Sequence, residues 1–211
     1  MDLNTLESKC RNFITKEIES DAAHDLAHIQ RVVSNALSIA EKETADLEIV
    51  LAAAWLHDCV VLPKDHPDRK KASTLAAEKG AAFLRTISYP GDKVTAVAHA
   101  IESHSFSAGI ETETMEAKIV QDADRLDALG AIGIARCFSV GGQMNSPIYN
   151  PDDPFCEKRT PDDKKWTIDH FFVKLFELPK TMHTAAAREM AEKRVQYMKE
   201  FLSELSSEIE V

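Results

Sequence analysis

The chain has 211 residues, of which 44% are hydrophobic, and it carries a formal net charge of −10 at pH 7. This length fits a single domain over residues 1–211, and the apolar content is sufficient for a buried core. The acidic balance disfavours sequence-independent binding to nucleic acid, which depends on many contacts from Lys and Arg to phosphates. It still allows a local basic pocket for a small phosphorylated ligand.

The four cysteines indicate a reduced, cytoplasmic protein, because they are far apart and form no CxxC pair. We interpret Cys59 as a small buried side chain rather than a metal ligand. The first residues, MDLNTLESKCRNF, are polar and charged, so we expect no signal peptide. No run of about 18 apolar residues occurs, so no membrane span is expected either.

In most of the first half of the chain, apolar residues recur at helical spacing and so predict helices. We expect a helix over residues 3–20 and another near 25–42, with His28 in its first turns. Residues 47–57, LEIVLAAAWLH, are apolar all round and predict a helix buried in the middle of the protein. Pro63 and Pro67 mark a loop, which an Ala-rich helix over 70–86 follows.

The second half also reads as helices joined by loops. After a turn at Pro90 and Gly91, a helix over about 94–101 leads toward His104. A helix from 117 is expected to run to 129 or, with a break, to 138; Gly130 and Gly133 permit either close packing or a kink there. A long surface loop is expected over 141–163, with helices near 164–177 and 183–208. No set of strands with a period of two residues is seen, so the predicted class is all-α.

Four residues offer ligands for a hard or borderline divalent metal ion, a type of ion that can generate hydroxide at neutral pH: His28, His57, Asp58 and Asp124. Neighbouring residues on a helix point about 100° apart, so His57 and Asp58 can reach one ion only near a helix end. The loop signals that begin at Val60 supply that end. A carboxylate buried without partners costs several kcal/mol, so Asp58 needs a cation or donors. For the two adjacent residues alone, the alternative is a buried His–Asp hydrogen bond without any ion.

The segment HDLAHIQRV, the HD pair about 30 residues later and the ADRL segment resemble the HD superfamily of metal-dependent phosphohydrolases. This resemblance extends over about residues 22–180. The segments HPDRKKAS, IESHSFSAG, EAKIVQDADRLDALGAIGIARCF and DDPF are similar to a bacterial subgroup of small standalone HD proteins. That subgroup looks related to HD proteins with nucleoside-triphosphate pyrophosphohydrolase activity.

The resemblance implies one HD domain, a helical bundle with the metal site between central helices and a C-terminal helix packed on its core. It places the ligands of one divalent ion on His28, His57, Asp58 and Asp124, with Asp58 also catalytic. Mixed nitrogen and oxygen ligands suit Mn²⁺, Fe²⁺, Co²⁺ or Ni²⁺ better than Mg²⁺ alone. The implied activity is a metal-dependent phosphohydrolase that acts on a small phosphorylated substrate, with nucleotides the expected class.

Leu62 departs from the family pattern. Some relatives carry a catalytic acidic residue at this position, four residues after the HD aspartate. A base must come from elsewhere, or the ion itself must deprotonate its water sufficiently. The departure keeps one alternative open, a nucleotide- or metal-sensing module without turnover. A 5′-nucleotidase is a further alternative for the activity. The oligomeric state is also open, with a homodimer as one alternative.

Further residues are candidates for contact with the substrate. His104 could donate a proton to a phosphate oxygen or to the leaving group, or could cap its helix. Lys64 and Arg69 belong to a basic segment suited to phosphate binding, or to a solvated helix start. His24 is a pocket residue or an exposed one. Asp127 is expected to orient a pocket group.

Overall fold

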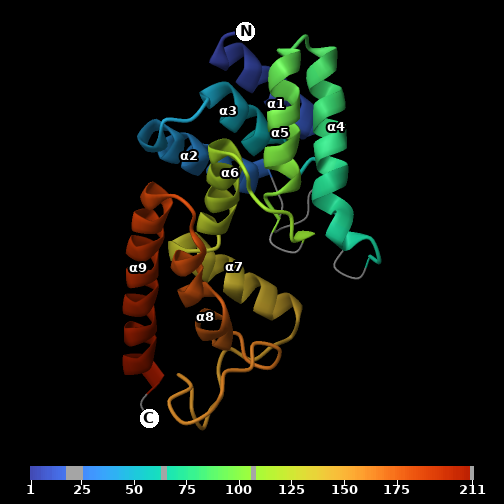
Figure 1. Cartoon of the computed structure of the whole chain (residues 1–211). Coiled ribbons are helices and arrows are strands. Elements are labelled where there is room, and N and C mark those ends of the chain that lie inside the picture. Colours follow the sequence, from blue (N-terminus) through green and yellow to red (C-terminus); the bar gives the residue numbers. More distant parts are fainter. Residues whose placement is uncertain (18–25, 63–65, 106–107, 210–211) are drawn as a thin grey trace. The chain divides into compact units, whose positions relative to one another are not determined.

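The computed structural model describes residues 1–17, 26–62, 66–105 and 108–209. Within these ranges every regular element is a helix and no strand occurs, which confirms the predicted all-α class. The chain divides into two compact units, Met1–Asp124 and Arg125–Val211 (Figure 1). No helix among the described residues is both long and apolar enough to span a bilayer.

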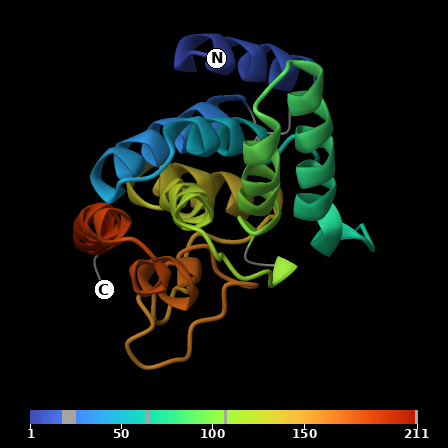
Figure 2. The same cartoon turned by 45° about the horizontal axis from the view of Figure 1, so that its top comes forward.

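The first unit is organised around the helix α3. Its helices are α1 (Leu3–Glu17), α2 (Leu26–Glu43), α3 (Leu47–Leu56), η1 (Arg69–Lys71), α4 (Ala72–Thr86), α5 (Gly91–Glu102) and the larger part of α6 (Met115–Leu126). Helix α3 packs against α1, α2, α4 and α5, and its residues from Ile49 to Leu56 are all buried. The prediction of a central buried helix is therefore confirmed. Helices α4 and α5 lie side by side (Figures 1 and 2).

Polar side chains fix where α3 begins. The carboxylate of Asp46 accepts hydrogen bonds from the backbone N–H groups of Glu48 and Ile49, which would otherwise have no partner within the helix. Lys93 at the start of α5 forms ion pairs with both Asp46 and Glu48 at 2.7 Å. These contacts fix the start of α3, the helix whose other end leads into His57.

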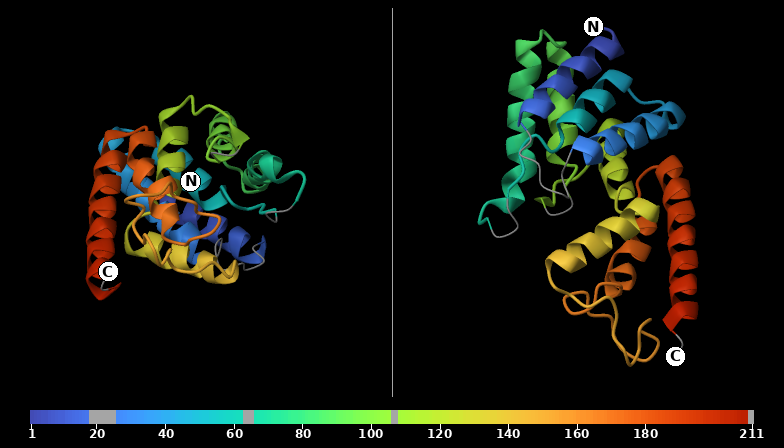
Figure 3. Two further views of the ribbon diagram at one scale, coloured as in Figure 1. Left: turned by 90° about the horizontal axis from the view of Figure 1, so that it is seen from below. Right: turned by 180° about the vertical axis from the view of Figure 1, so that it is seen from behind.

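The second unit packs aromatic side chains between its helices α7 (Gly130–Gln143), α8 (Asp169–Val173), η3 (Leu175–Thr181) and α9 (Ala185–Ile209). The ring of Phe171 is fully buried and lies within 6.5 Å, between ring centroids, of the rings of Phe138, Phe176 and Phe201. The arrangement of α7, α8 and α9 is seen from behind in Figure 3. Helix α9 packs on α7 and η3.

The predicted helix from 117 breaks between α6 and α7, and two glycines account for the break. Gly130 has a φ of +72°, which favours glycine over residues with a Cβ atom. At Gly133 a Cβ atom would lie 2.2 Å from the carbonyl oxygen of Ala128, so only glycine allows this close approach. Helix α7 continues to Gln143, five residues beyond the predicted limit at Phe138.

The helix predicted over 164–177 is wrong over its first part. The N–H groups of Thr167 and Ile168 donate to the carbonyl oxygens of Pro147 and Ile148, at 3.0 Å each, and so are not available for a helix. Only Asp169–Val173 is α-helical, and the 3-10 helix η3 follows.

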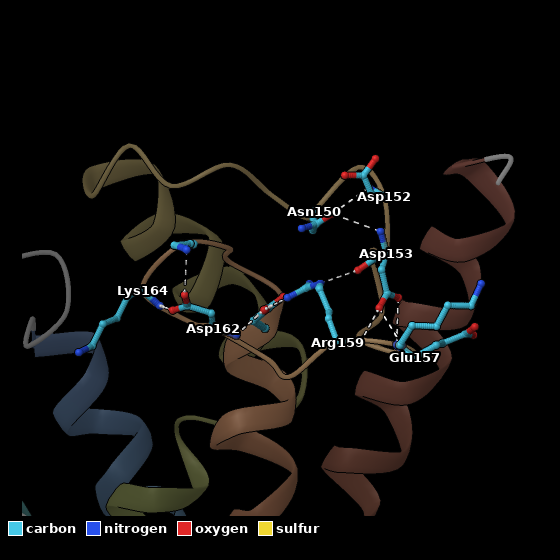
Figure 4. A network of polar contacts seen from close by, with 10 residues as sticks. Asn150, Asp152, Asp153, Glu157, Arg159, Asp162 and Lys164 are labelled. Carbon is cyan, nitrogen blue, oxygen red and sulfur yellow. Dashed lines mark hydrogen bonds and ion pairs between the residues drawn. The ribbon is translucent and has the colours of Figure 1, made fainter.

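The predicted long loop is confirmed and covers residues 144–168, where the described chain has no regular helix. Its polar groups form an internal network, drawn in Figure 4. The carboxylate of Asp153 accepts hydrogen bonds from the backbone N–H groups of Glu157, Lys158 and Arg159. Arg159 in turn donates to the backbone carbonyl of Asp153 and to both carboxylate oxygens of Asp169. The loop is therefore held in one conformation by charged hydrogen bonds.

Candidate metal centre

His57 is the first residue after α3, and one hydrogen bond sets the direction of its ring. Its Nδ1 atom donates to the carbonyl oxygen of Ala54 at 2.8 Å. Because a carbonyl can only accept, Nδ1 carries the proton of the neutral ring and Nε2 keeps its lone pair. Burial is the main cause of a lowered pKa for His57, which favours this neutral form. The Nε2 atom is buried, and among the described residues it has no hydrogen-bond partner.

Asp58 presents its two carboxylate oxygens to different imidazoles. Oδ2 lies 3.5 Å from Nε2 of His57 and 3.7 Å from Nε2 of His28, whereas Oδ1 lies 3.5 Å from Nε2 of His104. Burial alone would raise the pKa of Asp58, but the three imidazoles outweigh it and hold that pKa well below the usual range. The carboxylate is therefore ionised at neutral pH. Helix α3 ends at Leu56, so the adjacent His57 and Asp58 lie at a helix end, as the sequence predicts.

His28 and Asp124 reach the same place from two other helices. His28 lies in the first turn of α2 and is 98% buried, and Asp124 lies in the last turn of α6. The Oδ1 atom of Asp124 is 3.5 Å from Nε2 of His28. Among the described residues, His28, His57 and Asp58 form a group whose ligand atoms all lie within 4.8 Å of one another. Asp124 contacts this group through His28 but does not belong to it by that distance.

His104 lies two residues after α5 and is buried beside the group. Its Nδ1 atom donates to the carbonyl oxygen of Ile101 at 2.6 Å, which turns Nε2 toward Asp58. Its ring meets the ring of His57 edge to face, with centroids 4.9 Å apart. Burial by itself would lower the pKa of His104, but Asp58 and Asp124 outweigh burial and raise it. Both predicted roles of His104, facing the pocket and ending its helix, are consistent with this position.

The described residues fit a divalent ion. Two ligand atoms that each lie about 2.1 Å from one ion are about 3.0 Å apart at a right angle and about 3.4 Å apart at a tetrahedral angle. The separations of 3.5 Å and 3.7 Å around Oδ2 of Asp58 are close to these values. The buried Nε2 atom of His57, which lacks a hydrogen-bond partner among the described residues, is the stronger indication, because an unsatisfied buried acceptor is costly unless something binds it.

The remaining predicted residues lie in other surroundings. Arg69 is exposed in η1, and Asp127 is buried in the second unit, where Nη1 of Arg136 donates to it at 2.6 Å. His24 and Lys64 lie outside the described residues.

Cys59 is buried and donates to the carbonyl oxygen of Ala76 at 3.3 Å. Burial raises the pKa of its thiol to about 12, which agrees with its interpretation as a non-ligand. The sequence does not indicate Asn35, which contacts the helix of Asp124, or Gln121, which lies on that helix and contacts Ser103; their only signal is a polar side chain on a buried helix face.

A family model described as HD domain matches residues 25–129, a range that includes His28, His57, Asp58, His104 and Asp124. With the relatives below, this match shows that the chain belongs to the HD-domain family, which confirms the resemblance seen in the sequence. HD domains bind divalent metals, and among the residues that the structure describes His28, His57 and Asp58 form a group that could hold one.

The relatives are small bacterial proteins that match over almost their whole length. YpgQ of Bacillus subtilis strain 168, named as an uncharacterised protein, is 35% identical over 195 residues, which are 90% of this chain and 87% of YpgQ. A crystal structure of YpgQ in complex with ADP has a TM-score of 0.77 at 33% identity and covers 98% of this chain and 96% of its own. An HD-superfamily hydrolase from Bacillus thuringiensis has a TM-score of 0.77 at 34% identity, with 97% of both chains covered. This chain therefore has the fold of the HD-superfamily hydrolases.

Proposed function

We propose that this protein is a divalent-metal-dependent phosphohydrolase acting on small phosphorylated molecules, with nucleotides as the substrate class. The observation that carries the proposal is the buried Nε2 atom of His57, which lacks a hydrogen-bond partner among the described residues and lies 3.5 Å from the ionised Asp58. His28, His57 and Asp58 would hold the ion, with Asp124 as the fourth ligand. A bound divalent ion supplies Lewis acidity toward a phosphoryl oxygen and lowers the pKa of water to about 7.

The side chains around the site are suited to proton transfer and to orienting the group that transfers the proton. In hydrolysis, the attacking water gives up a proton to the solvent, its oxygen forms a bond to phosphorus, the bond from phosphorus to the leaving oxygen breaks, and that oxygen takes up a proton. The Nε2 atom of His104 is placed to provide this proton, because the hydrogen bond from Nδ1 to the carbonyl oxygen of Ile101 turns Nε2 toward the group around Asp58. The Oδ1 atom of Asp58 orients the ring of His104. Leu62, half-buried after the HD pair, offers no acid or base.

Two observations favour a nucleotide as the substrate. YpgQ, 33% identical over nearly the whole chain, crystallised in complex with ADP. The segment after the HD pair carries Lys64, Arg69, Lys70 and Lys71 in an otherwise acidic chain. An exposed Arg such as Arg69 can contact a phosphate with two parallel hydrogen bonds. Within this class we favour nucleoside triphosphates, hydrolysed with release of pyrophosphate, and Mn²⁺ or a similar transition metal as the ion.

A product screen tests the proposal. The purified protein is incubated with nucleoside mono-, di- and triphosphates and Mn²⁺, Mg²⁺, Co²⁺ or Ni²⁺, and orthophosphate and pyrophosphate are measured separately. We expect pyrophosphate from triphosphates; orthophosphate from monophosphates would instead identify a 5′-nucleotidase. The variant Asp58→Ala is expected to lose both metal and turnover while it remains folded. Full activity with an unchanged metal content in Asp58→Ala would overturn the mechanism.

The position of Leu62 favours one second candidate, a sensing module that binds a nucleotide or metal without turnover. A sensing module should bind the ion and a nucleotide in isothermal titration calorimetry, and it should form no product under any condition of the screen. The same samples therefore decide between the two functions.

A further inference from the structure

Two buried amide side chains connect the helices that carry the candidate ligands. Nδ2 of Asn35, on α2, donates to the carbonyl oxygen of Ala123, on α6, at 3.3 Å. Nε2 of Gln121, on α6, donates to the carbonyl oxygen of Ser103, at the end of α5, at 2.7 Å. Both side chains are more than 90% buried. Neither belongs to the group that could hold the ion.

The register of these contacts relates them to the site. Asn35 follows His28 by seven residues, close to two turns of α2, so the two side chains lie on one face of that helix. The carbonyl group that Asn35 contacts belongs to Ala123, the residue before Asp124. Hence the bond from Asn35 joins the helix of His28 to the backbone next to Asp124, whose carboxylate lies 3.5 Å from His28.

Gln121 likewise connects two segments that carry residues of the site, the helix of Asp124 and the segment of His104. It precedes Asp124 by three residues on α6, and such residues are neighbours on a helix surface. The carbonyl group that it contacts belongs to Ser103, the residue before His104. The bond from Gln121 therefore joins the helix of Asp124 to the backbone next to His104, whose Nε2 atom lies 3.5 Å from Oδ1 of Asp58.

We propose that Asn35 and Gln121 are positioning residues of the metal centre: they fix α6, and with it Asp124, against the helix of His28 and the segment of His104. This inference rests on the proposed metal site and goes beyond it, because it assigns the distance between Asp124 and His28 to two residues that are not among the candidate ligands of the ion. A third contact fixes the other end of α6, where Oε1 of Glu116 accepts from the backbone N–H of Asp46 at 3.0 Å.

The geometry explains why amides stand at these positions. A shift or rotation of α6 would change the distance of Asp124 from His28, and a directed hydrogen bond fixes the register of the helix in a way that non-directional apolar contacts do not. Asp124 is also the predicted ligand that lies outside the tight group, so its place depends most on α6. Residues that orient metal ligands through hydrogen bonds typically change metal affinity by about 10- to 100-fold when replaced.

The test compares metal affinity with stability. Asn35→Leu and Gln121→Met keep side-chain volume and remove the donor, and Leu84→Ala, a fully buried residue of α4, serves as a control that destabilises the same unit elsewhere. For each protein the dissociation constant for Mn²⁺ is measured by isothermal titration calorimetry at a temperature where it is folded, and the urea midpoint is measured without metal. We expect both amide variants to bind Mn²⁺ about 10- to 100-fold more weakly than wild type, and Leu84→Ala to bind it as wild type does even where its urea midpoint is lower.

The outcomes separate this inference from the proposed function. Weaker Mn²⁺ binding in the amide variants but not in Leu84→Ala supports the positioning role. Mn²⁺ binding that is unchanged in the amide variants, or that follows the urea midpoint across all three variants, overturns the positioning role alone. Absence of Mn²⁺ binding in the wild type overturns the metal centre and the positioning role together.

Discussion

The Nδ1 atom of His57 lies 2.8 Å from the carbonyl oxygen of Ala54, one turn earlier in the chain. This bond uses a carbonyl group of the last turn of α3, which would otherwise lack a partner in the helix. It fixes the tautomer of His57 and presents the Nε2 lone pair to Asp58. A helix end and a ligand direction are thus set by the same hydrogen bond.

The first prediction concerns this lone pair. His57→Gln is expected to weaken Mn²⁺ binding by more than about 100-fold, since loss of a mere orienting partner already costs about 10- to 100-fold. Isothermal titration calorimetry measures the change. His99→Gln is the matched control, because His99 contacts Glu102 and the backbone of Glu113 rather than the site. Binding in His57→Gln that equals binding in the control would remove His57 from the ligand set.

The second prediction separates two aspartates that are three residues apart. Asp124→Asn is expected to weaken Mn²⁺ binding, because it removes the charge that faces His28 at 3.5 Å. Asp127→Asn is expected to leave Mn²⁺ affinity unchanged and to destabilise the protein by about 3 kcal/mol, because it leaves the partly buried Arg136 without its carboxylate partner. Titration calorimetry and urea unfolding on both variants check this; equal effects on metal affinity would contradict it.

The sequence predicted the helices well where their pattern is local. The run before His57 is apolar on all sides, and a helix of that composition is expected to be buried. The structure agrees, because eight consecutive residues of the run are buried. The same run predicted that Asp58 needs partners, and three imidazoles surround it. The break after α6 was left open between close packing and a kink, because only the structure shows the positive φ of Gly130 and the close carbonyl of Ala128.

Long-range hydrogen bonds are what the sequence could not supply. Asn35 and Ala123 are separated by 88 residues, and no local pattern relates them. The same holds for the bonds from Thr167 and Ile168 to residues 147 and 148, which prevent the helix predicted there. Asp127 illustrates a third case: its buried carboxylate pairs with Arg136, a partner that the sequence does not indicate, and its role in orienting a pocket group stays a prediction.

The third prediction tests the role of His104. His104→Gln is expected to reduce the turnover number by about 10²- to 10⁴-fold, the usual contribution of a general acid, and to weaken Mn²⁺ binding much less than His57→Gln does. Steady-state kinetics with a triphosphate and metal titration on the same sample measure both quantities. A loss of Mn²⁺ binding comparable to that of His57→Gln would make His104 a metal ligand instead of an acid.

The fourth prediction concerns the long loop and its dependence on pH. Asp169 is fully buried and accepts hydrogen bonds from Nη1 and Nη2 of Arg159 and from the backbone N–H of Asp162. Burial alone would raise the pKa of Asp169, but these donors outweigh it and lower the pKa below the ordinary carboxyl value. Its ionised form is therefore bound more strongly in the folded protein than in the unfolded chain.

Because the folded pKa lies below the unfolded value of about 3.9, Asp169 contributes its full stabilisation above roughly pH 4, and this contribution is lost as the pH falls through the folded pKa. Asp169→Asn is expected to lower the free energy of unfolding by about 3 kcal/mol at pH 7, the cost of leaving Arg159 without its carboxylate partner. The difference from wild type should shrink toward acid pH. Urea unfolding followed by circular dichroism from pH 7 to pH 3 measures it, with Asp152→Asn, an exposed carboxylate of the same loop, as the control expected to change stability by less than about 0.5 kcal/mol. A difference between Asp169→Asn and wild type that stays constant over this range would mean that the charge of Asp169 does not hold the loop.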